Sequence, residues 1–182
     1  MGTVNVVLYE PEIPQNTGNI MRTCAATNTI VHLIEPLGFS LDQKNIKRAA
    51  ANYVKFTEYK CYKNWEEFIR INFSNDKNSN TMVFLTRYGK KHLYDFDFHD
   101  TDKNYFFVFG KESTGIPKDI LKKDLSHCIR LPMTENVRAL NLSNVVAIVV
   151  YEAFRQQNFP GMSEYEPDAS ILGFKGKDYL ES

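Results

Sequence analysis

The chain has 182 residues, 43% of them hydrophobic and 24% charged, with 22 basic and 22 acidic side chains. These are ordinary values for a globular protein, so the composition excludes a disordered or fibrous chain. No apolar run approaches the roughly 18 residues of a membrane span, and the N-terminal residues lack the features of a signal peptide or a myristoylation motif. We therefore expect a soluble, cytoplasmic protein with no membrane partner.

The cysteines and histidines predict no disulfide framework and no metal site. Cys24, Cys61 and Cys128 are odd in number and widely spaced, which is typical of small buried hydrophobic side chains. The four histidines are scattered, and only His127-Cys128 places two metal-ligand types together. Adjacent residues of a strand point to opposite faces, so this pair does not form a metal site.

Apolar runs and helical spacings alternate along the chain. In chain order, the expected elements are a strand at Val4–Tyr9, a helix at 17–28, a strand at Ile30–Ile34, helices at 42–51 and 64–72, strands at Met82–Thr86, Tyr105–Phe109 and Cys128–Leu131, and a helix at 141–157. Asn64 is the expected cap of the helix at 64–72, and residues 74–80 are typical of a surface loop. This rhythm predicts an α/β fold with a mostly parallel sheet flanked by helices on both faces.

The segment 141–157 is ambiguous because its VVAIVV run is rich in β-branched residues. Its 17 residues contain no Gly or Pro, and Glu152, Arg155 and Gln156 share one helical face. We interpret it as a helix buried in the core or in a subunit interface. We expect one domain over residues 1–160, followed by an acidic, mobile or only partly docked tail over 161–182.

Charge is distributed unevenly although the net charge is zero. Residues 41–63 contain six basic and two acidic side chains. This excess is compatible with a solvated helix face and with a phosphate-facing patch.

Three loops follow predicted strands, and open α/β sheets bind ligands at strand ends. The first, Asn16 to Arg22 (NTGNIMR), also suits a helix start capped by Asn16 or Thr17. The second, Phe109 to Pro117 (FGKESTGIP), carries two glycines but lacks the Lys-Ser/Thr of a phosphate-binding loop, and it also suits a simple turn with Pro117 at the first helical position. The third runs from Ile129 to Asn144, where Leu131 and Met133 suit the wall of a pocket and Asn141 or Ser143 suits a helix cap.

Taken together in order and spacing, NTGNIMR, FGKESTGIP and IRLPM…NLSNVVAIVVYEAFRQ resemble the SPOUT methyltransferases. VVLYEPEIPQNTGNI and LIEPLGF resemble the small TrmL-like (YibK-like) group, which methylates the ribose of the wobble nucleotide of tRNA. The resemblance covers residues 4–160. It implies a C-terminal trefoil knot, a homodimer, tRNA as substrate and S-adenosylmethionine (S-adenosyl-L-methionine) as methyl donor.

The resemblance also assigns roles to individual positions. The catalytic residues implied are Arg22, Asn16, Glu112 and Asn141. The cofactor-binding residues implied are Leu85, Gly110, Leu131 and Ala139. Ala139 departs from the group, which commonly has Ser there, so one hydroxyl contact is missing and weaker cofactor binding is expected. The basic stretch then becomes a surface for tRNA phosphates, with Lys44, Lys47 and Arg48 as its contacts.

Two other functions remain open from the sequence alone. The first is a related 2′-O-methyltransferase that acts on another tRNA or rRNA position, because the motifs bind cofactor while other loops select the substrate. The second is a non-catalytic RNA-binding domain, for which Ala139 is the motivation. A guanidinium keeps its proton to a pKa above about 12, so Arg22 is an awkward base and is better suited to stabilising an alkoxide or gripping a phosphate.

Overall fold

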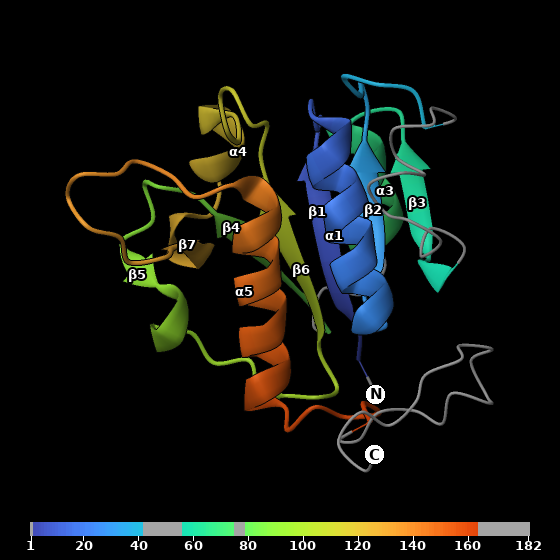
Figure 1. Ribbon diagram of the computed structural model, residues 1–182, viewed down its shortest axis with the longest axis vertical. Helices are drawn as coiled ribbons and strands as arrows, with labels where there is room; N and C mark the ends of the chain where they lie inside the picture. The colour runs from blue at the N-terminus through green and yellow to red at the C-terminus, as the bar shows by residue number, and fades with distance from the viewer. Residues whose placement is uncertain (1, 42–55, 75–78, 164–182) are drawn as a thin grey trace, which may run out of the picture.

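The computed structural model describes residues 2–41, 56–74 and 79–163. In this part of the chain seven strands form one parallel sheet in the order β3-β2-β1-β6-β4-β7-β5 (Figure 1). The strands are β1 (Val4–Tyr9), β2 (Ile30–Ile34), β3 (Tyr59–Tyr62), β4 (Asn80–Leu85), β5 (Lys91–His92), β6 (Asn104–Phe109) and β7 (Cys128–Arg130). Because all pairs are parallel, the carboxyl ends of the strands meet at one edge of the sheet, where such folds place ligands.

Five of these strands lie where the apolar runs predict them. β1 and β2 match their predicted bounds, and β4, β6 and β7 differ by one or two residues at an end. The sequence does not predict β3 or β5. Three of the four β3 side chains are exposed at the sheet edge and β5 has only two residues, so neither strand produces an apolar run.

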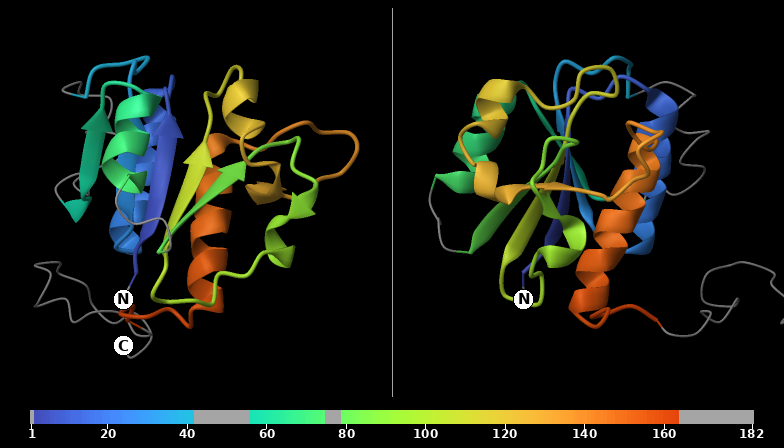
Figure 2. Two further views of the ribbon diagram at one scale, coloured as in Figure 1. Left: turned by 180° about the vertical axis from the view of Figure 1, so that it is seen from behind. Right: turned by 90° about the vertical axis from the view of Figure 1, so that its left-hand side faces the viewer.

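Helices cover both faces of the sheet, as predicted. They are α1 (Pro14–Ala26), α3 (Trp65–Phe73), α4 (Lys118–Leu121) and α5 (Leu142–Gln156), with 3-10 turns at Leu93–Asp95 and Leu125–His127. Figures 1 and 2 show α1 and α5 side by side on one face and α3 and α4 on the other. The α/β class and the layer arrangement are therefore confirmed.

The two faces of the sheet have different cores. Val6 and Leu8 of β1 pack with aliphatic side chains such as Ile20 of α1 and Val149 of α5. On the other face, neighbouring strand residues join a cluster rich in aromatic rings around Phe68. Burial on both faces explains why β1 is a continuous apolar run rather than an alternating one.

A buried histidine lies in the aromatic core. The Nδ1 of His32 is 2.8 Å from the hydroxyl of Tyr62, and its Nε2 is 3.1 Å from Oδ1 of Asn5. The amide nitrogen of Asn5 donates elsewhere, so Oδ1 accepts from a protonated Nε2 and Nδ1 accepts from the tyrosine. Burial, with a smaller contribution from the charge of Lys60, lowers the pKa of His32 to about 3, so this side chain is neutral at physiological pH.

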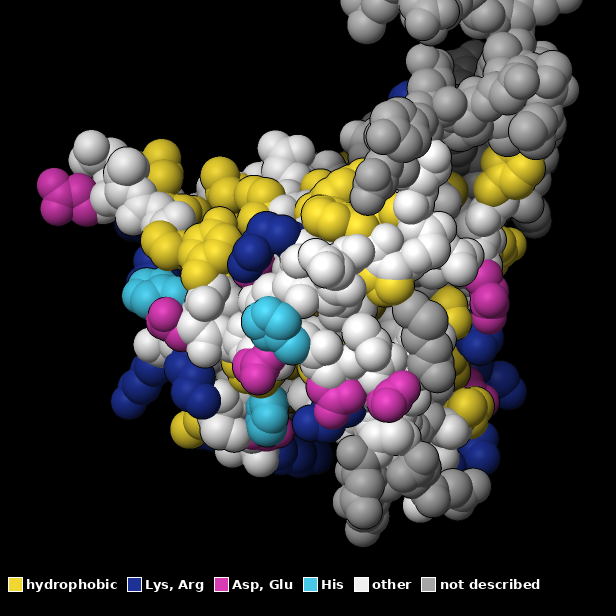
Figure 3. Space-filling view, turned by 90° about the horizontal axis from the view of Figure 1, so that it is seen from below, with side chains coloured by type: hydrophobic (Ala, Val, Ile, Leu, Met, Phe, Trp, Pro, Cys, Tyr) yellow, Lys and Arg dark blue, Asp and Glu magenta, His cyan; other side chains and the backbone are white. Residues whose placement is uncertain are grey.

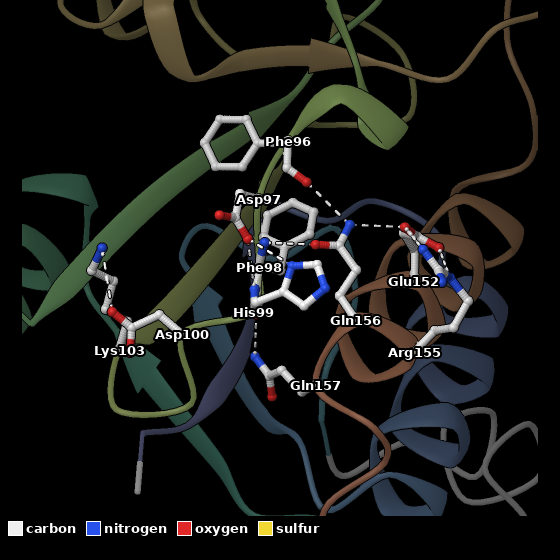
Figure 4. Close-up of polar contacts among 10 residues, drawn as sticks. All are labelled: Phe96, Asp97, Phe98, His99, Asp100, Lys103, Glu152, Arg155, Gln156 and Gln157. Carbon is white, nitrogen blue, oxygen red and sulfur yellow. Dashed lines mark hydrogen bonds and ion pairs between the residues drawn. The ribbon is translucent and has the colours of Figure 1, made fainter.

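The ends of α3 and α5 are held by side chains. Asn64 accepts a hydrogen bond from the Glu67 nitrogen (2.9 Å), which confirms the predicted cap. At the far end of α5, the Gln156 amide accepts from the Phe98 nitrogen (2.7 Å) and donates to the Phe96 carbonyl (3.0 Å), as Figure 4 shows. Gln156 also donates to Glu152 (2.8 Å), which is paired with Arg155. The last turns of α5 therefore clamp the segment that leads into β6.

Several predictions lie outside the described residues. These are the basic helix at 42–51, most of the loop at 74–80, and the acidic tail from residue 164 onward. Within the described ranges, no helix has both the length and the hydropathy needed to cross a membrane.

Candidate active site

A cavity of about 430 Å³ lies at the carboxyl edge of the sheet, beyond the ends of β4, β6 and β7. Its walls come from the segments that follow these strands and from the first turns of α1 and α5. Seven of the eight residues expected to serve catalysis or cofactor binding line it: Asn16, Leu85, Gly110, Glu112, Leu131, Ala139 and Asn141. A hollow of about 500 Å³ on the other face, beside α3 and β4, is lined by none of them. The three loops that the sequence singles out thus meet in one place.

Glu112 joins the loop after β6 to the start of α1. One carboxylate oxygen accepts from the backbone nitrogen of Glu12 (2.9 Å), and the other accepts from the nitrogen of Ile13 (3.3 Å) and the amide of Asn16 (3.0 Å). The N-cap residue Ile13 has no side-chain acceptor of its own. Glu112 therefore ties the residues that lead into α1 to a distant part of the chain, and its charge is favourable beside a helix N-terminus.

α1 begins earlier than predicted. The helix begins at Pro14, a favoured residue in the first turn, rather than at residue 17. Asn16 and Thr17 lie inside the helix, so the prediction that one of them caps it is wrong. Pro117 is likewise the N-cap of α4 and not its first helical residue.

The network continues from Asn16 to the loop that precedes α5. The amide of Asn141 donates to Oδ1 of Asn16 (3.0 Å), while Oδ1 of Asn141 accepts from the nitrogen (2.9 Å) and the hydroxyl (2.7 Å) of Ser143. Asn141 is thus the N-cap of α5, as one interpretation of the sequence predicts. Glu112, Asn16 and Asn141 link all three loops through their side chains.

Two further pairs join the segment before α1 to the loop after β6. Glu12 accepts from the nitrogen (2.9 Å) and hydroxyl (2.8 Å) of Ser113, and these bonds lower the pKa of its carboxyl group. Lys111 forms an ion pair with Glu10. Both contacts therefore fasten the chain before α1 to residues that line the cavity.

The structure shows why residue 110 is a glycine, which the sequence alone does not reveal. A Cβ atom at this position would lie 2.1 Å from the carbonyl carbon of Gly115 and 2.2 Å from the nitrogen of Ile116. The loop closes on itself here, and Gly115 has a φ of +75° that favours glycine. The loop's own backbone therefore fills the space that a side chain at this position would need.

Arg22 does not lie at this cavity. It is exposed and is the ninth residue of α1, rather than one turn inside the helix as predicted. It follows Asn16 by six residues, which is about 9 Å along the axis and about 120° around it. Helix geometry thus separates Arg22 from the cavity that Asn16 lines in the same chain.

Several exposed or partly exposed residues line the cavity without having been proposed as site residues from the sequence, among them Arg87, Tyr88, Arg130 and Arg138. Arg87 and Tyr88 come directly after β4, and Arg130 is the last residue of β7. Their position at or near the ends of predicted strands was the feature of the sequence that could have identified them. The predicted RNA contacts Lys44, Lys47 and Arg48 lie outside the described residues, and among those described no three metal-ligand side chains gather.

The cavity fits a compact ligand with an apolar, flat part. Its volume is in the range of small-molecule and cofactor sites. Leu85, Leu131, Met133 and Val145 supply aliphatic walls, and the small side chain of Ala139 leaves the backbone of its loop accessible.

A parallel sheet with a cavity at the carboxyl ends of its strands defines a ligand-binding protein of the α/β class. The sequence profile of the SpoU rRNA Methylase family matches residues 3–151, and the chain belongs to this family. A Geobacillus stearothermophilus protein is 51% identical over 160 residues, covering 88% of this chain and 99% of its own. A tRNA (cytidine(34)-2'-O)-methyltransferase of Burkholderia ambifaria is 42% identical, covering 86% of this chain and 97% of its own.

Solved structures agree with this assignment. One, described as "Structural insights into the 2-OH methylation of C/U34 on tRNA", is 33% identical with a TM-score of 0.78 and covers 86% of this chain and 97% of its own. The Streptomyces viridochromogenes methyltransferase AviRb, solved with AdoMet (S-adenosylmethionine), has a TM-score of 0.74 at 18% identity and covers 86% of this chain and 61% of its own. At that identity the second likeness shows the fold alone.

Proposed function

We propose that this protein transfers the methyl group of S-adenosylmethionine to the 2′-hydroxyl of nucleotide 34, the wobble position of tRNA. The substrate and the position are supported by the name of the 42% identical relative and by the description of the 33% identical structure. The observation that carries the proposal is the convergence of three loops on one cavity, joined by Glu112, Asn16 and Asn141. We propose a cytoplasmic location on the ground that the substrate is a tRNA.

The cofactor would lie against Leu85, Leu131 and Ala139, with the loop that begins at Gly110 along one side. When bound, S-adenosylmethionine supplies a methyl group already activated on a sulfonium. The protein must therefore orient the ribose and lower the barrier to loss of the hydroxyl proton. Orientation alone contributes about 7–11 kcal/mol in favourable cases.

The transfer would break the carbon–sulfur bond, form the carbon–oxygen bond and pass the hydroxyl proton to solvent water. The polar atoms of Glu112, Asn16 and Asn141 are largely engaged with one another and with helix ends. We infer that they position the cavity walls rather than exchange the proton. Arg22 keeps its own proton, so it serves by stabilising the developing alkoxide or by gripping the adjacent phosphate.

Arg22 reaches such a site only from a second copy of the chain, which favours a homodimer. α5 and the loop before it expose Leu140, Ile148 and Tyr151, with relative exposures of 41%, 37% and 47%. Figure 3 shows hydrophobic side chains along the upper part of the view, on the side of α1 and α5. An apolar surface on the layer that carries Arg22 suits a symmetric contact between copies.

The proposal is tested by methylation of tRNA with the purified protein and the cofactor, followed by mapping of the modified nucleotide. Methylation at nucleotide 34 is expected. Methylation elsewhere would favour another substrate position, and RNA binding without transfer would favour a non-catalytic domain.

Arg22→Ala is expected to lower single-turnover methylation by roughly 10²–10⁴, while S-adenosylmethionine affinity changes less than about fivefold. Arg22→Lys is expected to rescue poorly because an ammonium lacks the planar fork of a guanidinium. A mixture of Arg22→Ala and Asn141→Ala chains distinguishes the two geometries. Mixed dimers regain one intact site only if Arg22 acts across the interface, so a mixture as inactive as its components would contradict the dimeric site.

Two further parts of the proposal come from the resemblance. Lys44, Lys47 and Arg48 are proposed to contact tRNA phosphates, and their reversal to Glu is expected to flatten the salt dependence of tRNA binding. A C-terminal knot is supported by the strand order, because β6 and β7 are each inserted between strands that precede them in the chain.

A further inference from the structure

The mouth of the cavity is strongly basic. Among the described residues that line it, the charged side chains are Arg87, Lys111, Glu112, Arg130 and Arg138. Glu112 is committed to the start of α1 and Lys111 is paired with Glu10. Neither Glu112 nor Glu10 therefore balances the charges of the three arginines. The mouth of the cavity favours a negatively charged ligand beside the cofactor.

Arg130 carries an unsatisfied donor at this mouth. Its Nε is buried and donates to no acceptor in the part of the chain that the structure describes. A buried donor without a partner costs about 1–3 kcal/mol, so an acceptor brought by a ligand is favoured at this point. Arg138 lies in the exposed loop between β7 and α5, which lines the same cavity and extends past β7 in Figure 1.

Tyr88 adds a flat, exposed surface next to these charges. Its relative exposure is 58%, and the guanidinium of Arg87 lies over its ring at 4.8 Å from the centroid. The turn that carries it is fixed to β7, because the Thr86 nitrogen donates to the Ile129 carbonyl (3.0 Å) and Gly89 lies against the Ile129 backbone. The ring is therefore presented from a rigid support rather than from a free loop.

An exposed aromatic ring beside arginines is the combination by which proteins hold single-stranded nucleic acid: a base stacks on the ring and the cations hold the phosphates. We infer that Tyr88, stacked by Arg87, is a platform for an unpaired base of the RNA loop next to the methylated nucleotide, and that Arg130 and Arg138 hold its phosphates. This inference rests on the proposed function and specifies the substrate as a single-stranded loop.

Binding of an anticodon stem-loop RNA, measured by fluorescence anisotropy, tests the platform. Tyr88→Ala is expected to weaken binding roughly 5- to 100-fold, as expected for one stacked base, and Tyr88→Phe to stay within about twofold. Tyr94→Ala is the matched control, because Tyr94 has the same 58% exposure and does not line the cavity. A fully paired RNA duplex is expected to bind wild type and Tyr88→Ala alike. Equal effects of Tyr88→Ala and Tyr94→Ala on the stem-loop would overturn the platform.

The phosphate contacts are tested separately, because the carboxylate of the cofactor is the alternative anion. Arg130→Gln and Arg138→Gln are each expected to weaken stem-loop binding and to reduce its salt slope by about 0.7, the value for one single-strand phosphate. Arg70→Gln, on α3 at the other face, is the control. Calorimetry without RNA is expected to give wild-type S-adenosylmethionine affinity. Loss of cofactor affinity with unchanged RNA binding would assign these arginines to the cofactor and overturn the phosphate contacts.

The outcome is separable from that of the proposed function. If wild-type protein methylates nucleotide 34 while the Tyr88 and arginine variants bind RNA normally, only the platform fails. If wild-type protein transfers no methyl group to tRNA, the proposed function fails even where the variants lose RNA binding.

Discussion

Glu112→Gln is the substitution that tests the three-loop network most directly. The variant keeps the side-chain volume but replaces one carboxylate oxygen with an NH₂ group that faces an N–H donor. Wild-type Glu112 accepts from two backbone nitrogens and from the Asn16 amide at 2.9–3.3 Å. Hydrogen bonds to a charged group contribute about 1.5–3 kcal/mol, and a charge at a helix N-terminus about 0.3–1 kcal/mol.

Glu112 is partly exposed, so the lower end of these ranges applies. We expect the free energy of unfolding to fall by about 2 kcal/mol and Tm by about 4–8 °C for a chain of this size. The cavity wall should shift with the start of α1, so cofactor KM should rise together with the loss of stability. A group that only exchanged a proton would lower the turnover and leave both Tm and KM unchanged.

The assays are thermal unfolding and methylation at varied cofactor concentration. Glu135→Gln is the control, because Glu135 is exposed in the loop before α5 and does not line the cavity. Its expected change in stability is within about 0.5 kcal/mol. A Glu112→Gln variant with wild-type Tm and wild-type KM would refute the positioning role.

Three other substitutions follow from the geometry. Gly110→Ala should destabilise the protein and abolish cofactor binding together, whereas Gly115→Ala should cost only about 1 kcal/mol for its positive φ, as seen by urea unfolding and calorimetry. Gln156→Ala should lower the free energy of unfolding by about 2–3 kcal/mol, since three hydrogen bonds are lost; a loss below 0.5 kcal/mol would contradict the clamp. The pKa of His32 is lowered to about 3 in the fold against about 6.5 unfolded, so its contribution to stability is full above pH 6.5 and declines as the pH falls. Urea unfolding at pH 7, 6 and 5 should show up to about 1.4 kcal/mol per pH unit lost below pH 6, a slope that His32→Gln removes and that His99→Gln, at an exposed histidine, retains.

The strands and layers were predictable because burial on both faces leaves a continuous apolar run, as in β1 and β6. β3 was not predictable in this way, because an edge strand with exposed side chains carries no such signal. The prediction of where α1 begins failed for a different reason. The nitrogens of Glu12 and Ile13, just before the helix, donate to Glu112 from a distant part of the chain, and no local pattern around Ile13 reports a partner that the fold supplies.

The candidate site likewise has features that the sequence predicts and features that depend on contacts between distant parts of the chain. Motifs at strand ends were enough to bring Asn16, Glu112 and Asn141 together in prediction, because parallel strands end at one edge. The motifs did not reveal which atoms pair, nor that the backbone of Gly115 occupies the space beside Gly110. Arg87 and Tyr88 were missed because Leu85 was the one site residue proposed at this strand end, whereas the residues after the predicted strand Met82–Thr86 also line the cavity.

The position of Arg22 links these observations. α1 is held at its first turn by Glu112 and Asn16, and its 13 residues span about 20 Å as one rigid element. The contacts that fix the start of α1 at one cavity therefore also fix the position of Arg22, about 9 Å further along the helix and about 120° around it. In the proposed dimer, each cavity's network would then determine how well Arg22 fits the neighbouring site. Arg22 could thus act at a site it does not line in its own chain, and Glu112 could influence turnover without contacting substrate.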